Sequence, residues 1–223
     1  MKGRSTVKNL LIKEIRLAAS PLSFIFLAFS LMFFLPGYPI LCGAFFVCLG
    51  LFQSFQHARE QNDILYTLML PIRKKDAVRA KYLFVLALEG AAFLIMAIVT
   101  LIRMLFMADA AVYTENALMA ANPLALSFAL LIFLSFNVIF VGGFYRTAYK
   151  FGKPFVSFAL MAFMLIAIAE TLHHLPGLGF LNSTRGKELF VPCILLIISA
   201  LIFTSGTYYS CRKSQERFEK IDL

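Results

Sequence analysis

The sequence predicts an all-α polytopic membrane protein with six transmembrane helices, built as a single transmembrane domain over residues 1–223. Composition is the first observation: 61% of the residues are hydrophobic and only 15% are charged, whereas soluble domains carry about 25% charged residues. The second is the recurrence of apolar runs of about 20 residues, the length that crosses a hydrocarbon core. Because these runs are continuous and not alternating, they predict helices, which satisfy their own backbone in lipid.

The first predicted element is an amphipathic interfacial helix over residues 5–20. Val7, Leu11 and Ile15 recur at helical spacing, and the basic residues of the segment lie elsewhere on the helical wheel. Such a pattern is typical of a helix that lies on the membrane surface. Pro21 fits a break before the first span. The alternative is a plain basic flank to that span.

Six apolar runs follow and predict six transmembrane helices, the first of which is short unless it extends back through Ala18. The predicted spans are Leu22–Leu35, Ile40–Gln56, Tyr82–Met107, Leu124–Tyr145, Pro154–His173 and Leu189–Tyr209. The chain has no Trp, so Tyr and Phe are expected to serve as interfacial anchors.

The positive charges predict the orientation of these spans. The N-terminal segment, the loop after the second span, the loop after the fourth span and the tail hold five, six, three and four Lys or Arg residues, which is 18 of the 21. Only Arg103, Arg185 and Lys187 fall on the other side. The positive-inside rule therefore predicts that both termini are cytoplasmic. These charges flank spans and do not cluster with exposed aromatic residues, so nucleic acid is not an expected partner.

The polar, basic loop between the second and third spans, residues 57–81, has internal structure. Four of its apolar residues share one face of a predicted short helix: Ile64, Leu65, Leu68 and Met69. Pro71 ends this helix, and a basic cluster that begins at Arg73 marks the return to the membrane. An apolar helix in a polar loop indicates a docking element for a partner. The alternative is a peripheral helix that lies on lipid.

The same loop carries a motif that resembles a known family. It reads R-E-x-x-D, then L-P-x-R-K, then K-Y at the start of the third span. With the amphipathic N-terminal helix and six spans, it resembles the permease subunits of type-2 ABC exporters, especially the small bacterial group that handles peptides and antimicrobials. Asp63 stands where that family often has a small residue. The resemblance assigns ATPase coupling to Glu60, Asp63, Ile64, Leu65, Leu68, Met69, Pro71 and Arg73.

The resemblance implies a permease subunit in the bacterial plasma membrane that moves peptides, antimicrobials or other amphipathic molecules out of the cell. A separate cytoplasmic ABC ATPase, in two copies, would hold ATP and Mg²⁺, and a second permease copy or a related permease would complete the pore. The chain itself is expected to bind no cofactor and to be no enzyme, and it carries no G-x-x-x-x-G-K-[ST] phosphate loop. The family also implies that residues 174–188 dip back into the membrane, where Pro176 and Gly177 would allow a bend.

Three charged residues inside or near the ends of spans are candidates for a substrate path or for pairs between subunits: Glu89, Arg103 and Glu170. Charges within spans are costly and often functional. The alternative is that they reach the interface, which best suits Arg103. Asn137, Gly142 and Gly143 in the fourth span are expected to serve helix packing.

Other classes of protein fit the sequence less well. An intramembrane enzyme needs clustered Ser and His, paired Glu or an Asp-rich metal motif at span depth, and the sequence places no His beside an acid there. The four cysteines form no C-x-x-C pair, so no metal site is expected. A structural or sensor subunit without transport activity stays an alternative.

Overall fold

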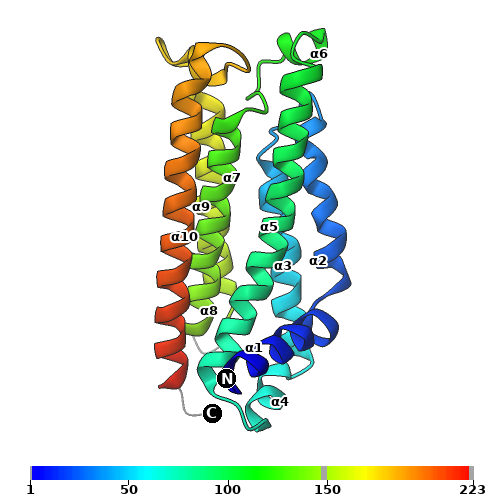
Figure 1. The fold of residues 1–223 in the computed structure, drawn as a ribbon, viewed down its shortest axis with the longest axis vertical. Helices are drawn as coiled ribbons and strands as arrows, with labels where there is room; N and C mark the ends of the chain where they lie inside the picture. The colour runs from blue at the N-terminus through cyan, green and yellow to red at the C-terminus, as the bar shows by residue number, and fades with distance from the viewer. Residues whose placement is uncertain (1, 147–149, 221–223) are drawn as a thin grey trace.

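The computed structural model describes residues 2–146 and 150–220, apart from the side chains of residues 2–6, Ala18, Ile64, Leu65 and Leu68. The described part is helical and contains no strand. Long helices run side by side in one bundle, as Figure 1 shows. This confirms the predicted all-α class.

The N-terminal part bends sharply before it enters the bundle. Its four helical pieces are α1 (Lys2–Lys13), the π-helical η1 (Glu14–Ala18), α2 (Pro21–Ile25) and the 3₁₀-helical η2 (Phe26–Phe34). The axes of Val7–Leu17 and Pro21–Phe34 differ by 91°. The Ser20 hydroxyl accepts a hydrogen bond from the Leu22 N–H and caps α2. Pro21 follows in the first turn, where its missing N–H costs nothing. The predicted break at Pro21 is therefore confirmed.

The rest of the chain alternates long helices with short connecting ones. They are α3 (Cys42–Glu60), α4 (Asp63–Met69), α5 (Lys74–Phe106), α6 (Ala111–Thr114), α7 (Pro123–Ser135), the π-helical η3 (Phe136–Val141), α8 (Gly142–Arg146), α9 (Gly152–Leu172), the 3₁₀-helical η4 (Gly179–Asn182) and η5 (Lys187–Leu189), and α10 (Phe190–Glu219). The fourth predicted span corresponds to the stacked pieces α7, η3 and α8. The segment 174–188 contains η4 and the start of η5, and its re-entry into the membrane stays a prediction.

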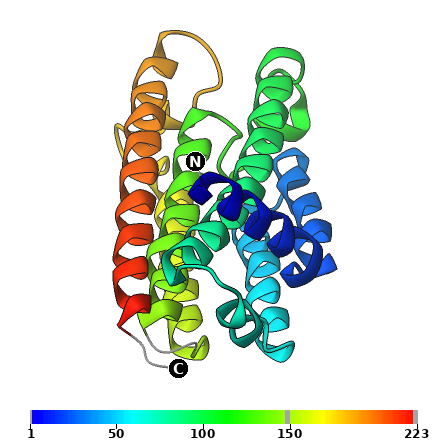
Figure 2. The ribbon, with the colours of Figure 1, turned by 60° about the horizontal axis from the view of Figure 1, so that its bottom comes forward.

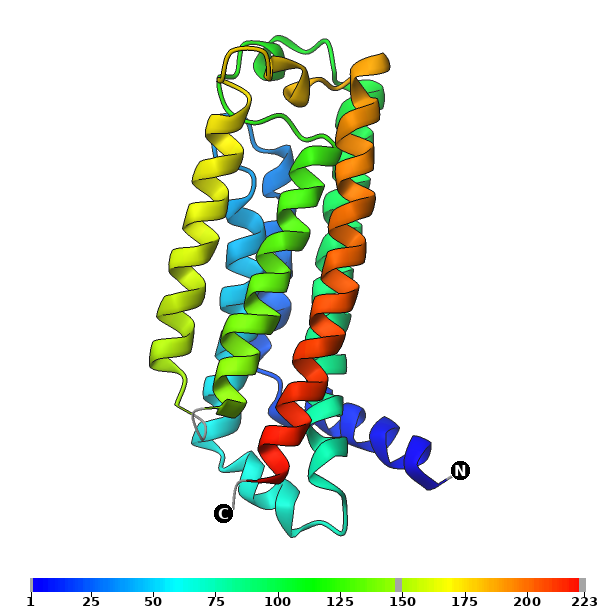
Figure 3. The same ribbon diagram turned by 90° about the vertical axis from the view of Figure 1, so that its left-hand side faces the viewer.

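Four helical stretches of the described chain are long and apolar enough to cross a membrane. They are Lys74–Phe106, Pro123–Arg146, Gly152–Leu172 and Lys187–Glu219, and the bent N-terminal pair raises the count to five if it is one span. The stretch α3 is not among them, because its last turns are polar. Both η2 and α3 nevertheless run alongside the longer helices (Figures 1 and 3). The chain is thus a multi-pass membrane protein, and the count of six spans stays a prediction.

The two ends of the bundle differ in character. One end, the basal end, carries α1, α4, the start of α5 and the last turns of α8 and α10 (Figure 1). Figure 2 shows α1 crossing this end in front of α5, and Figure 3 shows it projecting sideways from the bundle. The opposite, distal end carries α6, η4 and η5. All four basic segments of the sequence therefore meet at the basal end.

Phenylalanine rings fill the middle of the bundle between α3, η3 and α9. Phe136 lies 4.8 Å from Phe140 and 5.1 Å from Phe158, measured between ring centroids. Gly143 lets η3 and α8 approach α9, because a Cβ at this position would lie 2.9 Å from the Cβ of Pro154. A Cβ at Gly142 would lie 3.0 Å from the Ser210 hydroxyl oxygen of α10, so the predicted packing role of both glycines is confirmed.

Candidate coupling site and buried polar centre

The short helix α4 has one face that packs against the bundle and an opposite face that is exposed. Asn62 adopts the left-handed conformation, with a φ of 52°, and so turns the chain between α3 and α4. The hydroxyl of Thr67 is buried on the inner face. Tyr66 and Met69 are 67% and 81% exposed on the outer face. The structure therefore has an apolar surface on α4 that no other described element covers.

A cluster of charged side chains ties this helix to its neighbours. We call Lys13, Glu14, Asp63, Thr67 and Lys81 the basal cluster. The Lys13 ammonium donates to the Asp63 carboxylate and to the Thr67 hydroxyl, both at 2.6 Å. The Glu14 carboxylate accepts from Lys81 at 2.7 Å and from Lys13 at 3.2 Å. The junction of α1 and η1 is therefore joined to α4 on one side and to α5 on the other.

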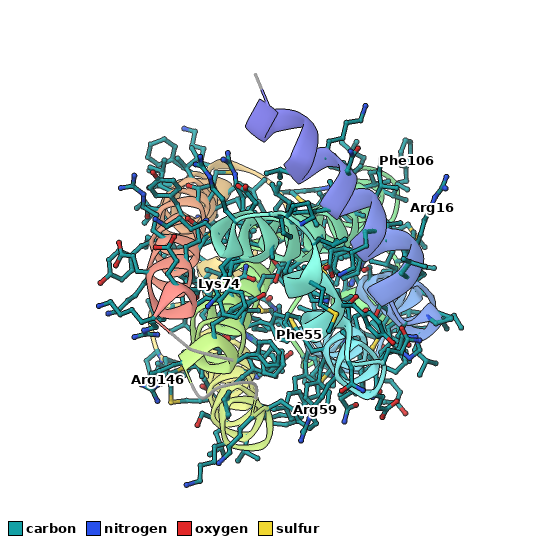
Figure 4. The ribbon with its side chains drawn as sticks, turned by 90° about the horizontal axis from the view of Figure 1, so that it is seen from below. Arg16, Phe55, Arg59, Lys74, Phe106 and Arg146 are labelled. Carbon is teal, nitrogen blue, oxygen red and sulfur yellow. The ribbon has the colours of Figure 1, made fainter. Side chains whose placement is uncertain are left out.

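The basal cluster is largely removed from water. The side chains of Glu14 and Lys81 are each 7% exposed, and the Lys81 ammonium lies 4.9 Å from the centroid of the Phe55 ring. Seen from below, Phe55 lies near the middle of the bundle, while Arg59 and Arg146 lie at its rim (Figure 4). Burial alone raises the pKa of the Glu14 carboxyl, but the ammonium groups of Lys81 and Lys13 outweigh burial and hold the pKa below its usual value of 4.5.

The predicted coupling residues separate into two groups. Glu60, Pro71, Arg73 and Met69 are exposed at the basal end, where a partner can reach them. Asp63 instead points inward to Lys13 and belongs to the basal cluster. The side chains of Ile64, Leu65 and Leu68 lie outside the described residues, so their docking role stays a prediction.

Sequence reasoning missed several residues of this site. Tyr66 belongs to the exposed surface of α4, and its position two residues after Ile64 placed it off the predicted face. Glu14 was also missed, although an acidic residue inside a basic amphipathic helix is an unusual feature that could have drawn attention. Lys81 matched the K-Y motif, but the sequence assigned it no partner.

A second polar site lies inside the bundle, between α5, η3 and α10. Glu89 is 1% exposed, and its Oε2 accepts from the Asn137 side-chain amide at 2.8 Å. The same amide group lies 3.3 Å from the Thr207 hydroxyl. Glu89 Oε1 and Asn137 Oδ1 have no hydrogen-bond partner among the described residues. Asn137 therefore does more than pack helices, because it holds the one carboxylate buried at this depth of the described chain.

The π-helical turn η3 extends this polar site toward the basal end. The Asn137 carbonyl accepts a hydrogen bond from the Ser210 hydroxyl at 2.9 Å. The Tyr82 hydroxyl lies 2.9 Å from that of Ser210 and 3.0 Å from that of Ser214. A π-helical turn frees backbone carbonyls from the regular ladder, and the hydroxyls of α10 satisfy one of them. We call Tyr82, Glu89, Asn137, Thr207 and Ser210 the polar centre.

The other two charged candidates lie at the distal end, and each has its own partner. Arg103 Nη1 donates to the Phe33 carbonyl at 2.6 Å, and its guanidinium lies 3.9 Å from the centroid of the Tyr113 ring. Glu170 Oε2 accepts from the Met119 N–H at 2.9 Å. Arg103 is only 6% exposed, and its bond to the Phe33 carbonyl holds the C-terminal end of η2. A role for either residue in a substrate path stays a prediction.

Metal ligands are not gathered anywhere in residues 2–146 and 150–220. No group of three His, Cys, Asp or Glu side chains in this part of the chain could hold a metal ion. The rings of His173 and His174 lie 4.1 Å apart at the end of α9, but no third ligand joins them.

Long apolar helices, a basic end with an uncovered short helix and a buried polar centre together characterise a multi-pass membrane protein. The sequence profile of the family described as ABC-2 family transporter protein matches residues 9–213. The chain belongs to this family and is an ABC-2 type permease, and membership of the family implies that it partners with an ABC ATPase. Neither a curated protein nor a solved structure matches the chain.

Proposed function

We propose that this permease is the membrane subunit of an ATP-driven exporter that moves peptides, antimicrobials or other amphipathic molecules out of a bacterial cell. The observation that carries the proposal is the uncovered apolar surface of α4, held by the basal cluster at the end where the basic segments meet. An exposed apolar helix flanked by charges fits the groove of a soluble partner. The direction of transport and the class of cargo rest on the resemblance of the loop that contains Glu60, Pro71 and Arg73 to the peptide-exporting group.

The basal cluster suggests how a movement of the ATPase reaches the membrane helices. A push on α4 acts on Asp63, and Asp63 holds Lys13 at 2.6 Å. Lys13 and the adjacent Glu14 move as one unit, and Glu14 holds Lys81 near the start of α5. A short helix at the surface is thereby linked to a long helix that carries Glu89 two turns further on. Two ATPase copies and a second permease copy or a related permease would complete the transporter, with ATP and Mg²⁺ held by the ATPase.

Purification tests this proposal directly. The tagged chain, isolated from its native membrane in mild detergent, is expected to bring an ABC ATPase with it and to show vanadate-sensitive ATP hydrolysis. Mass spectrometry of the intact complex gives the number of copies of each subunit. Recovery of the chain without any ATPase, after cross-linking in the membrane, would support a structural or sensor subunit in place of a transporter.

The orientation gives a first prediction. Both termini and α4 are expected to face the cytoplasm, because 18 of 21 basic residues lie at the basal end. In a variant without the four native cysteines, a membrane-impermeant maleimide is expected to label Ser183→Cys in intact cells. It should label Lys74→Cys only after the cells are made permeable. Labelling of Lys74→Cys in intact cells would show that α4 faces the outside and would contradict the predicted orientation.

The polar centre gives a second prediction. Glu89→Gln keeps an oxygen that can accept from the Asn137 amide, but it removes the ionisable group. If Glu89 receives a cationic cargo or pairs with the second permease, efflux of a fluorescent cationic amphipathic peptide should fall by about tenfold or more, while the amount of folded protein stays the same. Glu188→Gln, at an exposed glutamate of the distal end, serves as the control. Full efflux by Glu89→Gln would leave Glu89 with a packing role only.

A further inference from the structure

A groove runs along the outside of the bundle between α5 and α10, near the basal end. It measures about 460 Å³ and is lined by both helices. Toward the basal end its lining residues are Arg79, Arg212 and Gln215, and deeper along the helices they are Leu83, Leu86 and Phe203. The groove is therefore cationic at one end and largely apolar at the other, where the hydroxyls of the lining residues Thr204 and Thr207 already have partners within the protein.

The two arginines lie where lipid headgroups are expected. Arg79 precedes Tyr82, the predicted start of the third span, and Arg212 follows Tyr209, the predicted end of the sixth. Both α5 and α10 are long and apolar enough to cross the bilayer. Helices rise about 1.5 Å per residue, so Leu86 lies about 10 Å deeper than Arg79. The order of charge and apolar surface along the groove is that of a phospholipid, from headgroup to acyl chain.

The arginines are also available to a phosphate. Both are exposed, and neither forms an ion pair with any residue that the structure describes. The Arg212 guanidinium lies 5.4 Å from the centroid of the Tyr208 ring, a position that leaves its N–H groups free to donate. Glu216 follows Arg212 by one helical turn, but the two form no ion pair among those of the described residues. The nearby Glu219 is held by Lys75 at 2.9 Å.

We propose that this groove binds one anionic phospholipid, with its phosphate between Arg79 and Arg212 and an acyl chain along Leu83, Leu86 and Phe203. Basic pockets between membrane helices recognise anionic headgroups through such charges. The lipid joins α5 to α10, and α5 carries Lys81 of the basal cluster. The site requires only that these two helices cross the bilayer, so it does not depend on the proposed export function.

The absence of Trp from the chain allows a local test. A single reporter, Leu86→Trp, is placed in the groove, and Leu160→Trp, on the basal half of α9 and 69% exposed in the natural protein, reports on ordinary lipid contact. Each variant is reconstituted in phosphatidylcholine, and fluorescence quenching is measured with brominated phosphatidylglycerol and with brominated phosphatidylcholine. Leu86→Trp is expected to show about fivefold tighter binding of phosphatidylglycerol, and Leu160→Trp no preference. Leu83→Trp replaces Leu86→Trp if the latter does not fold.

Charge variants separate a site from a general surface effect. Arg79→Gln with Arg212→Gln should abolish the preference at the groove reporter. Arg146→Gln with Lys213→Gln removes the same charge from a separate hollow between α8 and α10 and should leave the preference intact. Equal quenching of Leu86→Trp by the two lipids would overturn the proposal. So would an equal loss of the preference for phosphatidylglycerol in both double variants.

Discussion

Lys81→Met is expected to lower the free energy of unfolding by about 3 kcal/mol and to uncouple ATP hydrolysis from transport. Removing one partner of a buried ion pair leaves the other charge without compensation, which costs about 3–5 kcal/mol. The low end applies here because Lys13 stays 3.2 Å from the Glu14 carboxylate. Unfolding of the purified protein in mixed detergent micelles by added dodecyl sulfate measures the change.

A matched control exists on the same helix. Lys75 pairs with Glu219 at 2.9 Å, but both side chains are nearly half exposed. Because exposed pairs contribute about 0–1 kcal/mol, Lys75→Met should have little effect on unfolding. The double variant Glu14→Gln with Lys81→Met should recover most of the stability lost by Lys81→Met. In the double variant, the Glu14 carboxylate that loses its Lys81 partner is absent as well. If the double variant instead loses as much free energy of unfolding as Glu14→Gln and Lys81→Met lose together, the ion pair makes no specific contribution to stability.

The same cluster predicts a dependence on pH. The pKa of Glu14 is lowered in the folded protein, so its ion pairs stabilise the fold above the usual value of 4.5. This contribution falls as the pH drops through the lowered pKa, because the carboxylate then takes up a proton. Acid unfolding curves of the wild-type protein and of Glu14→Gln should therefore converge at low pH. Curves that stay parallel at all pH values would contradict this assignment.

Tyr66→Asp is expected to abolish stimulation of the partner ATPase and its co-purification with the permease, while membrane insertion persists. Tyr66 is 67% exposed on the outer face of α4, so the change leaves the fold of the chain intact. If the residue is buried by the ATPase, an unpaired carboxylate in that contact costs on the order of 2 kcal/mol or more. Met69→Asp, at an 81% exposed position, should act in the same way.

The distal end offers a control of the same residue type. Tyr38 lies in the turn between η2 and α3 and is 62% exposed. Tyr38→Asp therefore makes the same chemical change at a similar exposure, and it should leave co-purification and ATP hydrolysis unchanged. Normal co-purification and ATP hydrolysis in both Tyr66→Asp and Met69→Asp would rule out α4 as the docking element.

The helices themselves could be predicted from the sequence, because the length of an apolar run and the positions of breakers are local properties. The break at Pro21 is one example. The start of α5 is different: the apolar run begins at Tyr82, but the helix already begins at Lys74. Hydrophobicity marks the part of a helix that meets lipid, whereas the helical backbone continues outside it wherever hydrogen bonds and packing allow.

Which polar side chains turn inward was decided only by the tertiary structure. Lys13 belonged to the polar face of a surface helix, and Asp63 to a docking loop, yet they meet although 50 residues separate them. The sequence likewise marked Glu89 as a costly charge without indicating Asn137 as its partner. A charge within an apolar run can be recognised in a sequence, since its desolvation cost is a property of one residue. The residue that pairs with this charge cannot be recognised in the sequence, because it depends on which helices pack side by side.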